Sequence, residues 1–215
     1  MAYIKLELPD LTPPQVRRFV EERIEPLYLS DVHAMFRLPL PQQEIHAGLN
    51  FSIAQILMAA ISGISTTMYE HKGDPGELFK GLTERYFPWD QETLSVSTKG
   101  AAGIIYDVFR NPLAHAAGLS MDWRGNNRYL VQSDSVEKVK RRLNENKTTG
   151  HTEEWLESLE RSVARPEMGP TLVVEPPRKV LMIEGLYWCV RRMICKLASD
   201  TERMARAAQF LKTYA

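Results

Sequence analysis

One stretch of the sequence limits the possible folds more than any other. From Ala47 to Tyr69 the chain carries no formal charge, and this stretch is long enough to cross a bilayer. Polar residues interrupt it, however, from Asn50 to Thr67. Its apolar residues recur at helical spacing as one stripe, formed by Ile53, Ile56, Leu57, Ala60, Ile64 and Met68. We therefore expect a helix buried in a core or an interface, in a protein that does not span a membrane.

Helical patterns divided by proline and glycine make up most of the remaining chain. Thr12-Pro-Pro-Gln15 is a capping box with proline at the first helical position. Asp74 and Pro75 open a second helix, which is expected to reach about Tyr86. Further helices are predicted for residues 99–110, 135–146, 151–163 and 180–197, and for the segment after the capping box Ser199-Asp-Thr-Glu202.

Strand patterns are few. The polar connector after residue 120 has room for one short strand, and residues 165–177 have room for one extended segment. The sequence contains no repeat of fixed period, no alternation of strands and helices, no glycine-rich phosphate loop and no Gly-x-Ser-x-Gly elbow. We predict an all-α helical bundle with little or no β structure, forming a single domain over residues 1–215.

Charge and cysteine content limit the partners and the compartment. Basic and acidic residues number 27 each, so any contact with nucleic acid requires a local basic patch. The first residues lack the basic and apolar regions of a secretory signal. Cys189 and Cys195 lie about 9 Å apart along one predicted helix, too far for a disulfide, and are expected to be buried thiols. The histidines show no metal-ligand spacing, so we expect a cytoplasmic protein with no metal and no cofactor.

The segment Arg110-Asn-Pro-Leu-Ala-His115 is the best candidate for chemistry. Pro112 disfavours helical geometry at Asn111 and suits the first turn of a new helix. We therefore predict that one helix ends at Arg110, that Asn111 caps the next one, and that His115 lies one turn further on. Both side chains would then point into one corner, whereas in one continuous helix they would lie about 140° apart around the axis.

An arginine and a histidine in one corner can cleave RNA without a metal. Imidazole exchanges protons near neutral pH, and guanidinium binds phosphate oxygens as a fork. A base next to the 2′-hydroxyl drives attack on the adjacent phosphate and leaves a 2′,3′-cyclic phosphate. Backbone N–H groups at the start of the second helix, near Leu113, would add affinity for the anion.

RNPLAH resembles the motif of the HEPN superfamily, which is arginine, a polar residue, and histidine four to six residues after the arginine. The resemblance covers about residues 45–120 and leaves residues 121–215 as a helical C-terminal extension. It implies a helical bundle with metal-independent endoribonuclease activity and a homodimer in which two motifs form a composite site. It also implies that Arg110 stabilises the phosphate, His115 transfers the proton, and Asn111 orients or caps.

The same resemblance implies a role in a defence, toxin–antitoxin or RNA-processing system, with a cognate partner protein as one option. Two alternatives stay open. The chain can be a catalytically inactive HEPN-like module that binds a nucleotide, RNA or a partner protein. The motif can also be only a helix boundary, in which Arg110 satisfies terminal carbonyls and His115 packs in the core.

A local basic surplus follows the motif in residues 122–147. Trp123 and Tyr129 are available there to stack on bases. The alternative interpretation is the solvated face of an amphipathic helix. The candidate RNA-binding residues are Arg124, Arg128, Lys138, Arg141 and Arg142.

Overall fold

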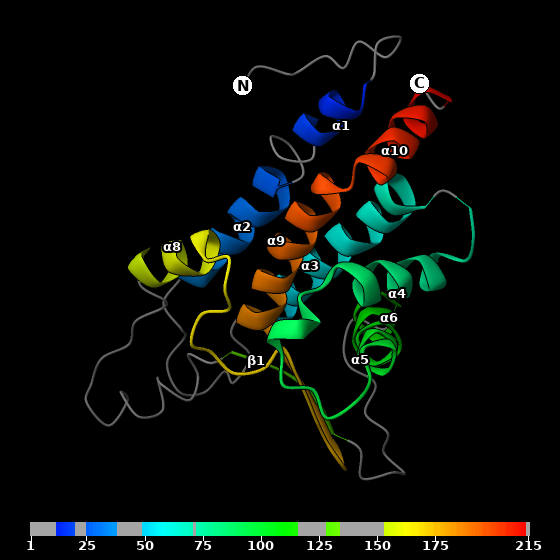
Figure 1. Ribbon diagram of the computed structural model, residues 1–215. Helices are drawn as coiled ribbons and strands as arrows, with labels where there is room; N and C mark the ends of the chain where they lie inside the picture. Colours follow the sequence, from blue (N-terminus) through cyan, green and yellow to red (C-terminus); the bar gives the residue numbers. More distant parts are fainter. Residues whose placement is uncertain are drawn as a thin grey trace.

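The protein is described by a computed structural model that covers residues 12–19, 25–37, 49–70, 72–115, 128–133 and 153–213. Most of these residues are helical (Figure 1). The elements are α1 (Pro13–Phe19), α2 (Glu25–Arg37), α3 (Asn50–Ile64), the π-helix η3 (Ser65–Tyr69), α4 (Pro75–Tyr86), the 3₁₀ turn η4 (Trp89–Gln91), α5 (Thr98–Ile104), the π-helix η5 (Ile105–Arg110), α6 (Asn111–His115), β1 (Arg128–Gln132), α8 (Glu153–Arg161), β2 (Leu172–Glu175), β3 (Arg178–Met182), α9 (Ile183–Ser199) and α10 (Thr201–Thr213).

Helix α9 forms the centre of the core. Tyr187 and Trp188 on this helix are fully buried, as are Leu186 and Val190. Helix α9 packs against α3, with α2 and α8 on one side and α4 on the other (Figure 1). A helix that is apolar around most of its circumference needs neighbours on several sides, and this explains its central place.

The uncharged segment forms α3 and η3. Most of its predicted stripe faces inward: Ile53, Leu57, Ala60, Ile64 and Met68 are buried, while Ile56 is partly buried. Helix α3 continues into η3, and together they are long and apolar enough to cross a membrane, although half of that segment is buried inside the protein. The predicted buried face is therefore confirmed.

A small mixed sheet corrects the expectation of little or no β structure. The strand order is β1-β3-β2, with β1 parallel and β2 antiparallel to β3. The short strand expected after residue 120 is β1, and the extended segment expected at 165–177 contains β2. Strand β3 was instead predicted to be the start of a helix. Val180 was placed on the helical stripe, yet it pairs with Leu130 and Val173, and α9 begins only at Ile183.

Helix caps were predicted correctly in two of three places. The Gln15 side chain accepts a hydrogen bond from the Thr12 N–H, and Asp74 accepts from two N–H groups at the start of α4. The third cap was assigned to Ser199, which instead donates to the Cys195 carbonyl. Asp200 caps α10 by accepting from the Arg203 N–H, because α9 extends to Ser199, two residues further than predicted.

The C-terminal helices pack directly on the N-terminal half. Helix α9 contacts α3 and α4, while α10 contacts η3 and α1. Arg203 on α10 lies over the Tyr69 ring at 4.6 Å, and Tyr86 donates a 2.5 Å hydrogen bond to Asp200. The division into a core at 45–120 and an extension at 121–215 stays a prediction, and the helix expected at 135–146 lies outside the described residues.

Candidate active site at Arg110

The motif lies on one continuous helix, and this corrects the predicted break at Pro112. Helices α5, η5 and α6 follow each other without a gap. Asn111 has right-handed helical angles, φ −63° and ψ −50°, so it is not an N-cap. Its N–H bonds to the Tyr106 carbonyl, five residues back. Such a π turn is a known way to accommodate proline, which lacks an N–H and clashes with the carbonyl four residues earlier.

This continuity removes the predicted reason for Arg110 and His115 to converge. A five-residue step along an α-helix ends about 140° around the axis from its start. The backbone of His115 ends α6, and its side chain lies outside the described part of the structure. The backbone positions of residues 110 and 115 therefore lie on different sides of this helix.

The Arg110 side chain is half-buried and held by neighbouring polar groups. Its Nε donates to Ser62 Oγ at 3.3 Å, and its Nη1 donates to Asn111 Oδ1 at 3.1 Å. Both acceptors are neutral oxygens, and these two bonds orient the guanidinium. Asn111 therefore contacts the Arg110 guanidinium, while its predicted role in catalysis stays a prediction.

Tyr106 supports the guanidinium from the preceding turn. The Arg110 guanidinium carbon lies 5.4 Å from the centre of the Tyr106 ring, and Lys80 Nζ lies 5.6 Å from the same ring. Both distances are in the range of cation–π contacts. A hydrogen bond to Glu77 raises the pKa of Lys80 above its usual value, so Lys80 is charged at neutral pH.

A pocket of about 350 Å³ opens beside Arg110, between α3 and α6. Helix α3 contributes Gln55, Met58, Ala59 and Ser62. The motif helix contributes Arg110, Leu113 and Ala114. Gln55 Nε2 donates a 2.9 Å hydrogen bond to the Leu113 carbonyl and so ties the two helices together. The pocket volume is within the range of small-molecule sites.

Sequence reasoning missed Gln55 and Ser62 as site residues. Both lie in the uncharged segment, where they were treated only as interruptions of the apolar stripe. They are seven residues apart, which is about two helical turns, so they share one face of α3. Their spacing by whole turns on a mostly apolar helix was the sequence signal that α3 could form the second wall of the pocket beside Arg110.

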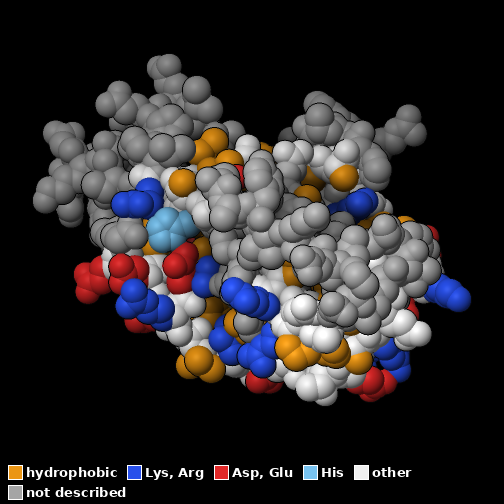
Figure 2. Space-filling model, turned by 90° about the horizontal axis from the view of Figure 1, so that it is seen from above, with side chains coloured by type: hydrophobic (Ala, Val, Ile, Leu, Met, Phe, Trp, Pro, Cys, Tyr) orange, Lys and Arg blue, Asp and Glu red, His pale blue; other side chains and the backbone are white. Residues whose placement is uncertain are grey.

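The candidate RNA-binding residues lie almost entirely outside the described residues. Arg128 opens β1, but its side chain is not described. Arg124, Lys138, Arg141 and Arg142 lie in ranges without description. On the face shown in Figure 2, basic and acidic side chains of the described residues are interspersed, in keeping with the zero net charge.

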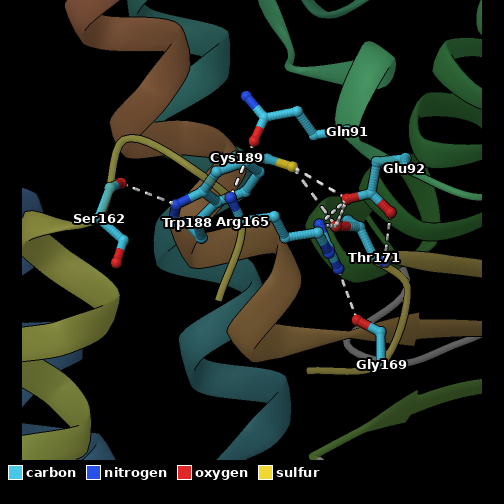
Figure 3. A network of polar contacts seen from close by, with 8 residues as sticks. All are labelled: Gln91, Glu92, Ser162, Arg165, Gly169, Thr171, Trp188 and Cys189. Carbon is cyan, nitrogen blue, oxygen red and sulfur yellow. Dashed lines mark hydrogen bonds and ion pairs between the residues drawn. The ribbon is translucent and has the colours of Figure 1, made fainter. Parts of the chain in front are cut away.

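A second polar cluster surrounds Glu92, which directly follows η4 (Figure 3). Glu92 is fully buried and forms an ion pair with Arg165. Its carboxylate also accepts from the N–H and hydroxyl of Thr171. Burial raises the pKa of the neighbouring Cys189 thiol, which suppresses the reactive thiolate. The cluster therefore fastens residues 165–171 to the core.

A third cluster joins α2, α8 and α9. Glu160 Oε1 lies 2.6 Å from His33 Nδ1 and accepts a 2.7 Å hydrogen bond from the Tyr187 hydroxyl. Burial opposes ionisation of Glu160, but the hydrogen bonds from Tyr187 and His33 outweigh it and lower the pKa of Glu160. The carboxylate therefore stays ionised and links three helices.

The two cysteines differ in burial, and neither belongs to a group of possible metal ligands in the described ranges. Cys189 is buried as expected, but Cys195 is exposed, which corrects the prediction of two buried thiols. Within the described ranges, no group of three or more His, Cys, Asp or Glu side chains is placed to hold a metal. A metal-free site stays a prediction, because His115 and the other histidines except His33 are not described at the side-chain level.

Comparison with known proteins adds no relative. No family model matches the chain, and neither a curated protein nor a solved structure is significantly similar to it. Function must therefore be argued from the pocket beside Arg110 and from the motif itself.

Proposed function

We propose that the chain is a metal-independent endoribonuclease of the HEPN type. The observation that carries this proposal is the placement of Arg110, whose guanidinium is oriented by Ser62 and Asn111 at a pocket. A fixed, permanently charged fork is suited to phosphate oxygens and to the charge that builds up during phosphoryl transfer.

The proposed reaction is internal transesterification of RNA. His115 accepts the proton of the 2′-hydroxyl, and the 2′-oxygen attacks the adjacent phosphorus. The bond from phosphorus to the 5′-oxygen breaks, and this oxygen takes up a proton from water as it leaves. Arg110 stabilises the phosphate oxygens, and the products are a 2′,3′-cyclic phosphate and a 5′-hydroxyl.

A homodimer is part of the proposal, since positions 110 and 115 lie on different sides of one continuous helix. In a composite site, the partner subunit's His115 would approach Arg110. The uncharged outer face of α3 lies beside the pocket and supports such contact; its exposed residues are Phe51, Gln55, Ala59 and Gly63. Gly63 at the end of this face lies in open space and permits close approach of a second helix.

The proposal also includes an RNA-binding role for Arg124, Arg128, Lys138, Arg141 and Arg142, and a cytoplasmic location. A defence, toxin–antitoxin or RNA-processing system, with a cognate partner protein, is the expected setting. These statements rest on the motif and on the local charge of the sequence.

The second candidate is an inactive HEPN-like module that binds nucleotide, RNA or a partner protein. The continuous motif helix favours it, because binding of phosphate by Arg110 requires no convergence of positions 110 and 115. The two candidates therefore share the anion site and differ in the proton-transfer step.

Cleavage of a mixed RNA pool in EDTA tests the proposal. Wild type, Arg110→Ala and His115→Ala are compared, with Arg161→Ala as the matched control because Arg161 is highly exposed on α8. We expect cyclic-phosphate ends from wild type and the control, and a loss of at least about a hundredfold in both motif variants. Absence of cleavage by folded, RNA-binding wild type would support the inactive module instead.

A further inference from the structure

The exposed face of α3 carries one large apolar side chain next to the pocket between α3 and α6. Phe51 is 37% exposed, and it precedes Gln55 and Ala59 at four-residue steps, so the three side chains follow one line along the helix. Among the described residues, the other exposed large hydrophobics are Leu49 and Val163, and neither lies on this line. An exposed aromatic ring beside an apolar pocket is typical of a contact surface.

The same face is free of charge. No lysine, arginine, aspartate or glutamate occurs between Asn50 and Tyr69, which is the whole length of α3 and η3. Surfaces that stay in water carry many charged side chains, whereas the centres of protein interfaces are depleted of them. A second copy of the chain brings an equally uncharged α3, so no charge of this helix is buried when two such faces meet.

The pocket fits the phenyl ring of Phe51 in size and polarity. Met58, Ala59 and Leu113 make most of its lining apolar, and its volume of about 350 Å³ has room for one aromatic ring. Phe51 does not line the pocket of its own chain, where it lies two turns of α3, about 12 Å, before Ala59. The ring that fills the pocket is therefore supplied by another chain.

Two-fold symmetry allows both copies to make this contact at once. If Phe51 of one chain contacts Ala59 of the other, the reverse contact follows from the symmetry. Residue 55 is midway between these two positions, so the axis passes beside Gln55 and the two α3 helices run antiparallel. Gln55 donates one amide hydrogen to the Leu113 carbonyl, which leaves its Oε1 and its second amide hydrogen for Gln55 of the partner subunit.

The same axis relates the two motif helices. The motif helix runs antiparallel to α3, since Arg110 contacts Ser62 while Leu113 contacts the earlier residue Gln55. Its end is therefore directed toward the start of α3. Because the start of one α3 faces the second half of the other, the end of the partner's motif helix comes to the side of Arg110.

We propose that the pocket beside Arg110 is a socket for Phe51 of the partner subunit in a two-fold homodimer. The inference rests on the homodimer in the proposed function, and it adds the occupant of the pocket, the register of the two helices and a residue outside the motif. The ring covers the apolar lining and leaves the guanidinium at the edge of the contact, where Ser62 and Asn111 orient it. The socket requires no proton transfer, so it applies equally to an active nuclease and to an inactive module.

Sedimentation equilibrium of the full chain measures this contact without any RNA. Phe51→Ala removes the ring, and Leu49→Ala is the matched control, because Leu49 is also 37% exposed but lies off the line of Phe51 and Gln55. Circular dichroism verifies that each variant is folded.

We expect wild type and Leu49→Ala to be dimers of similar affinity. Phe51→Ala should raise the dimer dissociation constant by at least about a hundredfold, since each dimer loses two buried rings. A wild-type monomer would overturn the socket, and so would a Phe51→Ala dimer as tight as wild type.

Cross-linking tests the register in a Cys195→Ser background, which removes the exposed thiol. Gln55→Cys should form a disulfide-linked dimer on mild oxidation, because the two residues 55 meet at the axis. Gly63→Cys is the control on the same face, since two residues 63 would be about 24 Å apart along antiparallel helices. Efficient linking through residue 63, or a dimer that is not linked through residue 55, would contradict the socket.

These outcomes are separable from that of the cleavage assay. A dimer that depends on Phe51 but cleaves no RNA keeps the socket and rejects the nuclease. Cleavage of RNA by wild type, together with a dimer that does not depend on Phe51, keeps the nuclease and rejects the socket.

Discussion

Tyr106 shows how a single residue connects the stability of the fold to the candidate site. It packs against Phe79 with ring centres 5.2 Å apart, and it carries the Arg110 guanidinium on its face. Its ring also lies directly against Gly76, where a Cβ atom would come within 2.7 Å of ring atoms. Glycine at position 76 therefore permits Tyr106 to support Arg110.

Gly76→Ala should lower the free energy of unfolding by about 1–3 kcal/mol, because the added methyl group forces Tyr106 to move. Urea denaturation measures this change. Gly103→Ala is the matched control, since its Cβ would be 3.9 Å from the nearest atom, and a gain of about 0.5–1 kcal/mol is expected from helix propensity. Equal stability of Gly76→Ala and wild type would show that Tyr106 does not press on α4.

Asp200 is a second residue whose role can be measured, here through pH. Burial opposes its charge, but the Tyr86 hydroxyl and the Arg203 N–H outweigh burial and lower the pKa of Asp200. A carboxyl with a lowered pKa in the folded state stabilises the protein above its unfolded pKa of about 3.9. That stabilisation is lost as the pH falls through the folded-state value.

Asp200→Ala should therefore cost about 1–2 kcal/mol at pH 7, and the difference from wild type should shrink below about pH 4. Asp200→Asn keeps the cap and separates its loss from the loss of charge. The measurement is urea denaturation as a function of pH. A cost that stays constant down to pH 3 would contradict the assignment of an ionised cap.

At the scale of elements, the buried cluster in Figure 3 explains how an irregular connector is held in place. Residues 165–171 join α8 to the sheet and have little regular structure of their own. Arg165 donates its N–H to Gln91 at 2.8 Å, and Thr171 donates its N–H to Glu92 at 3.0 Å. The connector thereby docks on η4, and β2 enters the sheet in register.

Glu92→Ala should destabilise the protein by about 3–5 kcal/mol, because it leaves the buried Arg165 charge and Thr171 N–H without their acceptor. Glu167→Ala, at an exposed position in the same connector, should have an effect below about 0.5 kcal/mol. Thermal unfolding followed by circular dichroism compares the two. Similar melting temperatures for both variants would show that the connector is held by other contacts.

At the scale of the whole molecule, the outer face of α3 is the proposed dimer contact. Gly63 lies on this face in open space, with no atom within 4 Å of an added Cβ. Arginine at this position has better helix propensity than glycine, so it should not reduce the stability of one chain. It would, however, place a charge in the proposed dimer contact.

Gly63→Arg should therefore convert a dimer into monomers, and in a composite site it should also abolish RNA cleavage. Light scattering coupled to size-exclusion chromatography measures the mass against 24.6 kDa for one chain. Ala205→Arg, on an exposed position of α10, should leave the mass unchanged. A wild-type monomer, or a dimer that survives Gly63→Arg, would remove α3 from the interface.

The positions of several helices, their buried faces and their caps were determined by local sequence patterns. The stripe of α3, the caps at Thr12 and Asp74, and the amphipathic α8 depend on neighbours within one or two turns, so they could be predicted. The helix end predicted at Arg110 was wrong, because the helix continues through Asn111 and Pro112.

Tertiary structure decided what depends on distant neighbours. Strand β3 has an apolar pattern too short to distinguish from the first turn of α9, and only pairing with β1 and β2 makes it a strand. The helix continues through Pro112 because a π turn makes room for it, which propensity alone does not predict. Gln55 and Ser62 became site residues only because α3 packs beside Arg110, across about fifty residues of sequence.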